Sequence, residues 1–347
     1  MRRVRLAAPL LALALAAALP AAGADFKGKS VAMIVGSEPG GGTDAAARLT
    51  APFFEKYLPG NPSIVVRNMP GAQGVTAINY ALQQTRPDGL TIIAGSSSQA
   101  DPLVTHKSGA LYDPVKLIYV GGVGRGGSVV LINAQSEKRL HDKSQPPLFF
   151  GALDGERSSE QIGLWGIEYL GWNAKWVLGY RGTSAVMLAL ERGEIDMNAT
   201  GSLFQIKSLV DSGKFHVLTQ SGMLQGGRFV GRPDFGRAPV LGEQLEGKLA
   251  DKPARDAFAY YEGINALDKW TALLPGTPED IVLAYRAAFE KMAADSEFLE
   301  RGRKISGEID PMSAANVEFL VKQIAGTTDE TEKFIKALQR HQGLHVQ

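Results

Sequence analysis

The sequence contains no cysteine, and this absence excludes a disulfide framework, a thiolate metal site, a cysteine nucleophile and a lipid-anchored N-terminus. It also lacks a surplus of charge of either sign, since 37 Lys and Arg residues stand against 36 Asp and Glu residues. That balance does not point to nucleic acid or an anionic membrane as a partner. Enzyme motifs are missing too: neither G-x-S-x-G nor H-E-x-x-H occurs, and the five histidines have no metal-ligand spacing. We therefore expect no catalytic residue, no metal site and no cofactor.

The N-terminus has the three parts of an export signal. Residues 1–5 are basic, residues 6–20 form a short apolar run, and small residues occupy positions 22–24. This pattern predicts a signal peptide over residues 1–24, cleaved near Ala24, and hence a periplasmic protein. The alternative is an N-terminal membrane anchor, but the apolar run is short for a bilayer span of about 20 residues.

Strand-like and helix-like runs then alternate along the chain with short connections. SVAMIV (30–35), SIVVRN (63–68) and the end of PDGLTIIAGSSS (87–98) are strand-like. Helix-like segments follow the first two strands, and Pro52 predicts a kink or a break in the first helix. This is the pattern of βαβ units on a mostly parallel sheet.

The middle of the chain predicts a second αβ set. Residues 121–133 are glycine-rich and then β-branched, and we interpret them as one strand that crosses to another domain. Residues 215–222 are interpreted as the returning strand. We therefore expect a discontinuous domain 1 of residues 25–126 plus 222–347, and a domain 2 of residues 127–221.

A helix start is predicted in TPEDIVLAYRAAFEKM. Thr277 is expected as the N-cap, with Pro278 at the first helical position and Asp280 at the third. The apolar residues that follow have helical spacing, which indicates core packing. They are Ile281, Tyr285, Ala288, Phe289 and Met292.

The loop GSEPGGGTD (36–44) places three glycines between the first strand and its helix, where bare backbone N–H groups can approach an anion. Two nucleotide motifs nearly fit this loop. A P-loop would need a lysine where Gly42 stands. A dinucleotide fingerprint would need an acid at the end of the second strand, which is Arg67-Asn68. Arg67 could accept a 2′-phosphate, so the residues alone leave this alternative open, but export disfavours a nucleotide.

A second loop, NMPGAQGVT (68–76), lies between the next strand and helix. Two such loops side by side would aim two helix N-termini at one crevice. Each terminus stabilises an anion by about 0.3–1 kcal/mol, and by more when it is partly buried. The two loops therefore predict a small carboxylate held without a lysine or an arginine. The alternative is that the glycines only form tight turns.

Five motifs together resemble a known family. EPGGGTDAAAR, VVRNMPGAQGV, RPDGLTIIAGSSS, GYRGTSAVMLALERGEID and LLPGTPEDIV occur in the order typical of solute-binding proteins of tripartite tricarboxylate transporters, the Bug family. The similarity runs from about Phe26 to the C-terminus. It implies an α/β, two-domain periplasmic-binding-protein fold of type II, the flytrap fold, with mostly parallel sheets and a cleft between the domains.

The resemblance also implies a function. Such a protein is a monomeric receptor that captures a small organic anion, here a di- or tricarboxylate, and delivers it to integral-membrane permease subunits without catalysis. Nucleic acid is not an expected partner. Two alternatives stay open: a periplasmic enzyme acting on a carboxylate, and a ligand sensor for a signalling partner.

The family's ligand site, carried onto this sequence, draws on loops of both domains. The first loop would bind one carboxylate through the backbone around Gly41, Gly42 and Thr43, and the second loop would bind the same group. Loops of the other domain would contact the far end of the ligand. The expected ligand-binding residues are Ser37, Gly41, Gly42, Thr43, Asp44, Gly71, Ala72, Gln73, Gly74, Ser96, Ser97, Ser158, Ser159, Tyr180, Arg181, Thr183, Asn198 and Thr200.

Two positions depart from the family pattern. Gly36 and Ser37 stand where family members carry a proline and an aromatic that covers the ligand, so the pocket here is expected to be wider or wetter. Gln73 stands in place of the first glycine of a pair. Its side chain could add a hydrogen bond, or it could restrict the approach of the ligand.

Several charged residues need an assignment. Glu38 lies near a site proposed for anions, so it must face solvent or pair with a base such as Arg67 or Arg125. Arg181 is the best candidate to hold the far carboxylate of the ligand, followed by Arg125 and Arg157. The alternative for each arginine is a solvated surface side chain.

The remaining conspicuous residues are interpreted as structural. Three tryptophans fall within twelve positions and indicate core packing, and His216 is expected in a strand, in the core or the hinge. Glu194 and Asp196 lie two apart on a presumed strand without an evident partner acid, which disfavours a glycosidase-like pair. The tryptophans are Trp165, Trp172 and Trp176.

Overall fold

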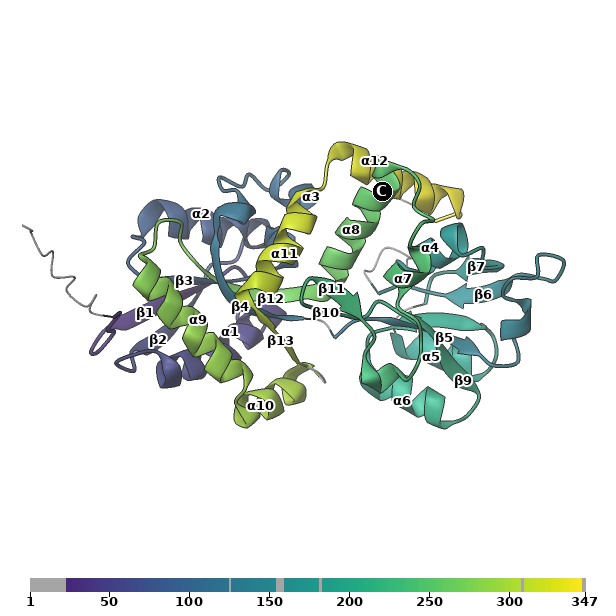
Figure 1. The fold of residues 1–347 in the computed structure, drawn as a ribbon, viewed down its shortest axis with the longest axis horizontal. Helices are drawn as coiled ribbons and strands as arrows, with labels where there is room; N and C mark the ends of the chain where they lie inside the picture. The colour runs from purple at the N-terminus through teal and green to yellow at the C-terminus, as the bar shows by residue number, and fades with distance from the viewer. Residues whose placement is uncertain (1–22, 125, 154–158, 181–182, 307–308, 345–347) are drawn as a thin grey trace, which may run out of the picture.

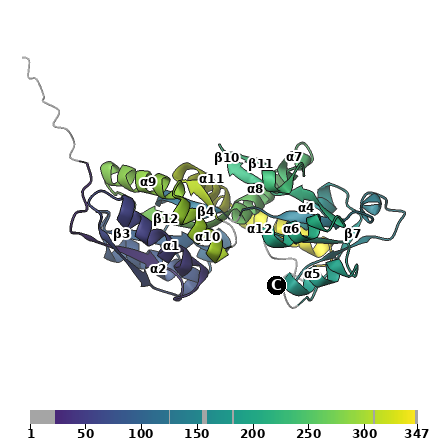
Figure 2. The same cartoon turned by 90° about the horizontal axis from the view of Figure 1, so that it is seen from below.

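The computed structural model describes residues 23–124, 126–153, 159–180, 183–306 and 309–344. Almost all of the predicted signal peptide therefore lies outside the described residues. The ribbon has two lobes along its long axis, with one large β-sheet in each (Figures 1 and 2). In the described part of the chain, no helix combines the length and the apolar character that a membrane span requires.

The first sheet has the strand order β13-β4-β12-β3-β1-β2. Strands β1, β2 and β3 are parallel to one another, and β12 runs antiparallel to both β3 and β4. The carboxyl ends of β1 to β4 and the start of β12 therefore lie at one edge of the sheet. The bounds are β1 Ser30–Val35, β2 Ser63–Asn68, β3 Thr91–Ser96, β4 Ile118–Gly124, β12 Leu267–Leu273 and β13 Asp310–Ser313.

The second sheet has the order β7-β6-β8-β5-β9. Here β6 is parallel to β7 and β8, whereas β5 is antiparallel to β8 and β9. A short hairpin of β10 and β11 lies between the lobes in Figure 1. The bounds are β5 Val129–Asn133, β6 Leu148–Gly151, β7 Ala174–Val177, β8 Met197–Thr200, β9 Phe215–Gln220, β10 Met223–Gln225 and β11 Arg228–Val230.

Helices cover both faces of the first sheet. The helices α1 and α9 pack on one face in a core with Val31, Met33 and Val35, while α2 and α11 pack on the other face with Ile93 and Trp270. Burial on both faces explains why these strands are near-continuous apolar runs. The helices of this lobe are α1 Gly42–Tyr57, α2 Val75–Gln84, α3 Pro102–Thr105, α9 Glu279–Ala293, α10 Ser296–Ser306 and α11 Ala314–Ala325.

The other helices surround the second sheet or join the lobes. Helix α8 packs against α11 of the first lobe and against α12, which in turn contacts α4. It therefore links the two lobes, as Figure 1 shows. The bounds are α4 Ile162–Tyr169, α5 Thr183–Glu191, α6 Leu203–Asp211, α7 Leu241–Leu245, α8 Lys252–Ala266 and α12 Asp329–His341.

The strands of the two sheets fall on either side of the predicted domain boundaries: β5 to β9 lie within residues 127–221, and the strands of the first sheet lie outside that range. The segment 222–347 nevertheless contributes to both lobes. Leu241, Phe258 and Leu338 pack in the same core as Phe150 and Trp165 of the second lobe. The exact domain limits stay a prediction.

The strands predicted at residues 30–35 and 63–68 are confirmed. The single strand predicted over residues 121–133 is wrong, because β4 and β5 are separate strands in different sheets. Between them Gly126 and Gly127 have φ of 78° and 80°, which breaks the extended backbone. The helix α1 continues through Pro52, which lies on its exposed side, so the predicted break is wrong.

The start of α9 differs by one residue from its prediction. Pro278 is the N-cap, and the hydroxyl of Thr277 donates to the carbonyl of Leu274 at 2.8 Å instead of capping the helix. The predicted core stripe is confirmed, since Tyr285 and Phe289 are fully buried.

The three tryptophans pack in the core of the second lobe, as predicted. His216 lies in β9 but not in a core: its Nε2 faces Glu137 at 3.3 Å and its side chain is partly exposed. Glu194 and Asp196 precede β8 rather than sharing a strand face. Asp196 accepts hydrogen bonds from Arg139 and from other groups near the start of β6, which is a structural role.

Candidate functional site

The two glycine loops meet at the carboxyl edge of the first sheet. A Cβ on Gly36 would lie 2.5 Å from Cα of Gly74, so no side chain fits between them. The backbone N–H of Met69 donates to the carbonyl of Val35 at 2.8 Å. Glycine at position 36, a departure from the family pattern, therefore allows the first loop to lie against the second.

Asp44 holds the first loop in place. Its carboxylate is 2% exposed and accepts from the Gly40 N–H at 2.8 Å, Arg48 Nε at 2.9 Å and Asn68 Nδ2 at 2.8 Å. Burial raises the pKa of Asp44, but the hydrogen bonds from Arg48, Gly40 and Asn68 outweigh it and hold that pKa below its usual range. These bonds make Asp44 a support of the loop, and its predicted contact with the ligand stays a prediction. The base beside this loop is Arg48, while Glu38 faces solvent.

The first turn of α1 offers open donors. Ser37 Oγ accepts from the N–H of Asp44 at 3.1 Å, and the N–H of Ala45 donates to the carbonyl of Gly41 at 2.9 Å. The N–H groups of Gly42 and Thr43 form no hydrogen bond to any acceptor among the described residues. These two donors lie at the positive end of the helix dipole, where an anion is stabilised.

The second loop has a constrained backbone. Gly71, Ala72, Gln73 and Gly74 all have positive φ, and for Ala72 and Gln73 this is unfavourable. The side chain of Gln99 holds this loop: its Nε2 donates to the carbonyl of Gln73 and its Oε1 accepts from the N–H of Ser96 at 2.6 Å. The side chain of Gln73 is exposed.

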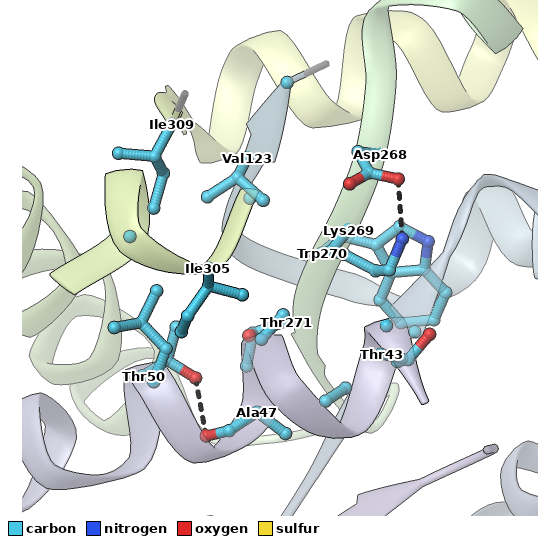
Figure 3. A pocket seen from close by; sticks show the side chains of 18 of the residues that line it. Thr43, Ala47, Thr50, Val123, Asp268, Lys269, Trp270, Thr271, Ile305 and Ile309 are labelled. Carbon is cyan, nitrogen blue, oxygen red and sulfur yellow. Dashed lines mark hydrogen bonds and ion pairs between the residues drawn. The ribbon is translucent and has the colours of Figure 1, made fainter. Parts of the chain in front are cut away.

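A cavity of about 480 Å³ lies between the lobes. The first lobe contributes the first turn of α1 and the start of β12, and the second lobe contributes Ser159, Gly201 and Ser202. Figure 3 shows Thr43 and Lys269 on one side and the apolar Val123, Ile305 and Ile309 on the other. The cavity is therefore polar at the helix start and apolar along α10.

Lys269 is a cation that the sequence interpretation missed. Its Nζ lies 2.5 Å from Oδ1 of Asp268, and both side chains are mostly buried. A Cβ on Gly42 would lie 3.8 Å from Cε of Lys269, so the lysine chain passes beside the first turn of α1. The sequence predicted a carboxylate held without a lysine, whereas the structure brings Lys269 to the first glycine loop. The available signal was a charged pair, Asp268-Lys269, inside a strand whose other residues are apolar except for Thr271.

Asn265, at the end of α8, was also missed. It lines the cavity and is 2% exposed, and its Oδ1 accepts from Ser128 Oγ at 3.1 Å. Ser128 is in turn bonded to Ser221, because the N–H of Ser128 donates to Ser221 Oγ at 2.8 Å and the N–H of Ser221 donates to the carbonyl of Ser128 at 2.8 Å. The chain passes between the lobes at Ser128 and again at Ser221. These bonds connect both of these segments to the wall of the cavity.

A second cavity of about 320 Å³ lies within the second lobe. It shares Ser159, Gly201 and Ser202 with the first, so the two cavities adjoin. The predicted residues Asn198 and Thr200 line it. Ser202 is the N-cap of α6, whose start therefore faces the same space.

The predicted site residues thus fall into four groups. Gly42, Thr43 and Ser159 line the first cavity, with Gly41 directly before them, and Ser159, Asn198 and Thr200 line the second. The predicted residues of the loops after β1, β2 and β3 that line neither cavity are Ser37, Asp44, Gly71, Ala72, Gln73, Gly74, Ser96 and Ser97.

The remaining predicted residues are Ser158, which precedes α4 in the sequence, and Tyr180, Arg181 and Thr183, which lie before or at the start of α5. Tyr180 packs partly buried against the core that contains Val186, and Thr183 begins α5. Ser158 and Arg181 lie outside the described residues, as do Arg125 and Arg157. Within the described ranges, no group of three or more His, Asp or Glu residues could hold a metal ion.

Two α/β lobes with a cavity between them are the architecture of periplasmic binding proteins. The chain belongs to the family described as the tripartite tricarboxylate transporter family receptor (TctC), whose family model matches residues 47–235. This family consists of solute-binding receptors of a transport system.

The chain is also similar to two known proteins. A UPF0065 protein of Bordetella pertussis is 26% identical over 299 residues, which cover 83% of this chain and 84% of that protein. The crystal structure of a TctC solute binding protein from Polaromonas, without ligand, has a TM-score of 0.64 at 18% identity. The match covers 90% of this chain and 98% of that one, so the two chains share the fold.

Proposed function

We propose that this chain is a periplasmic solute-binding protein that captures a small organic carboxylate, with di- and tricarboxylates included, for a tripartite tricarboxylate-type membrane transporter. The observation that carries the proposal is the wall of the first cavity. The open N–H groups of Gly42 and Thr43 and the Lys269 side chain lie side by side there, on two elements of one lobe.

The electrostatics of this wall favour an anion. A helix N-terminus contributes about 0.3–1 kcal/mol, and a charge-assisted hydrogen bond about 1.5–3 kcal/mol. In the structure Lys269 forms an ion pair with Asp268. A bound carboxylate would therefore share the Lys269 ammonium group with the Asp268 carboxylate. The volume of the cavity lies in the range of small-molecule sites, about 300–1,000 Å³.

The two-lobed architecture supports a receptor role. Both lobes line the cavity, so a ligand that contacts both stabilises their closed arrangement by its differential affinity. Asn265 contacts the crossing segments and the cavity wall at once. A permease that recognises the closed arrangement would then collect only the loaded receptor. Catalysis is not part of the proposal.

The direct test is a thermal-shift screen of the exported form against C3 to C8 mono-, di- and tricarboxylates and aromatic acids. Isothermal titration calorimetry and NMR of the ligand after prolonged incubation would follow. We expect at least one acid to raise the melting temperature, to bind with one-to-one stoichiometry and to be recovered unchanged. Conversion of the acid to a product would favour the periplasmic-enzyme alternative, and the absence of binding by every acid would reject the proposal.

A further inference from the structure

A third cavity lies apart from the two described above. Its volume is about 490 Å³, and none of its lining residues lines either of the other two. The wall is formed by the β10–β11 hairpin, α7, α8 and α11, which lie together where the lobes join (Figures 1 and 2). Helix α11 packs in a core of the first lobe and α7 in a core of the second, so both lobes contribute to this cavity. We call it the junction groove.

Aromatic rings make up much of the apolar wall of the junction groove. They are Phe229 of the hairpin, Phe258 of α8 and Phe319 of α11. Phe258 is 7% exposed, whereas Phe319 is 36% exposed and therefore accessible to a ligand. Phenyl rings bury the apolar part of a small molecule and attract a cation over their faces. The groove thus has the volume and the surface of a small-molecule site.

One carboxyl group of this wall has no partner. Glu262 of α8 lines the groove, and among the described residues its carboxyl forms no hydrogen bond and no ion pair. Burial alone raises the pKa of Glu262 to about 8. The side chain keeps some exposure to solvent, so a ligand in the groove can reach it. A carboxyl group in such a place is stabilised by a cation that arrives with a ligand.

The other charged residues of the wall do not neutralise Glu262. The guanidinium group of Arg255 donates to two backbone carbonyls of the loop before α8, at 2.7 and 3.1 Å. The remaining charged lining residues, Arg228, Glu243 and Glu246, are exposed. Two arginines thus balance these two acids, and Glu262 is the acid in excess. Because the rest of the wall is largely apolar and aromatic, the matching cation is an ammonium group on an apolar body.

We infer that the junction groove binds a primary amine with an apolar body. The ammonium group pairs with the Glu262 carboxylate, and the body packs against Phe229 and Phe319. When the amine binds, the Glu262 carboxyl releases its proton to solvent, and the two charges pair where water is partly excluded. The groove shares no lining residue with the first cavity, so the inference does not depend on the proposed function.

The test compares ligands that share a body and differ in the polar group. Calorimetry on the exported form at about pH 8, where primary amines are still protonated, measures the dissociation constants of 2-phenylethylamine, 2-phenylethanol, n-hexylamine, n-hexanol and methylamine. We expect at least one of the two larger amines to bind with one-to-one stoichiometry. It should bind at least 10-fold more tightly than the alcohol with the same body and than methylamine. Equal affinity for amine and alcohol, or no binding of either larger amine, overturns the inference.

The variant Glu262→Gln assigns the binding to this side chain. It removes the charge, so the affinity for the amine should fall at least 10-fold while the alcohol binds as before. Glu279→Gln is the matched control, because it removes the same charge from an exposed position at the start of α9 that does not line the groove. Amine affinity unchanged in Glu262→Gln, or equally reduced in both variants, overturns the inference. If Glu262→Gln does not fold, the comparison of amines and alcohols in the wild-type protein still decides.

Discussion

Lys269 Nζ lies 2.5 Å from Oδ1 of Asp268, and the stem of this lysine passes beside Gly42 at the start of α1. The pair places a positive charge at a helix N-terminus and, at the same time, a negative charge that competes with any anionic ligand. In the protein interior such a pair carries a desolvation penalty, so its presence in a central strand indicates a role other than stability. We expect Lys269 to bind the ligand carboxylate together with the open amides of α1.

The first prediction concerns Lys269→Met. Methionine keeps the length and the apolar stem but removes the charge. Loss of a charge-assisted hydrogen bond of about 1.5–3 kcal/mol should weaken the binding of a carboxylate by about 10- to 150-fold. Calorimetry with an acid found in the thermal-shift screen would measure this change.

Lys269→Arg is the control for this variant, because it keeps the charge, and it should lose less affinity than Lys269→Met. Affinity unchanged in Lys269→Met would show that the ligand does not contact the cation.

The second prediction concerns Gly42→Val. A Cβ at this position meets only Lys269, at 3.8 Å, and Gly42 has no positive φ, so the fold should tolerate the change. The branched side chain would, however, occupy the approach to the amides of the first turn. We expect a melting temperature within about 3 °C of wild type and a loss of carboxylate binding of at least about 10-fold.

A matched variant is Ser296→Val, which introduces the same side chain at the first position of α10. It should leave affinity unchanged. Normal carboxylate affinity in Gly42→Val would refute the role of the α1 amides.

The elements of the first lobe could be predicted from local pattern. The apolar runs at residues 30–35 and 63–68 coincide with β1 and β2. Strand β1 lies inside the sheet and is mostly buried, which requires a near-continuous apolar sequence, whereas β2 is an edge strand in which Val65 and Arg67 are exposed. The positions of the glycine loops could also be predicted from the sequence. Glycine is required where the backbones of two loops meet, as at Gly36 and Gly74.

The walls of the cavities could not be predicted in this way. Lys269 and Asn265 reach the first cavity from β12 and α8, which lie far beyond Gly42 in the sequence. Their proximity depends on the strand order β3-β12-β4 and on the helix that joins the lobes, which no local pattern encodes. The contacts of Asp44 with Arg48 and Asn68, which hold the first loop, likewise depend on the three-dimensional arrangement.

The third prediction concerns Asp44→Asn. An amide at this position would direct an N–H₂ group at donors that now bind the carboxylate, so we expect a loss of unfolding free energy of about 1–2 kcal/mol at pH 7. Because the pKa of Asp44 is lowered from 3.8, its stabilisation is complete above that pH and is lost as the pH falls through the lower value of the native state. Urea titrations should therefore show the difference from wild type at pH 7 and its decrease below about pH 4. A difference that stays constant down to about pH 2.5 would contradict this role of the carboxylate.

The fourth prediction concerns Glu262 of α8, whose side chain lies beside Gly242 of α7. Burial raises the pKa of Glu262 from 4.5 to about 8, and Oε1 of this residue is 3.0 Å from the position of a Cβ on Gly242. Between these two pH values the native state keeps a proton that the unfolded state has released, so the free energy of unfolding falls as pH rises and the loss is complete above about pH 8. Glu262→Gln is neutral at every pH and should be more stable than wild type by about 1–3 kcal/mol at pH 8, less than the full shift implies because the side chain keeps some exposure to solvent. Below pH 4.5 the two proteins should have the same stability, so denaturation curves at pH 4, 6 and 8 that differ by a constant amount would contradict the buried, protonated carboxyl.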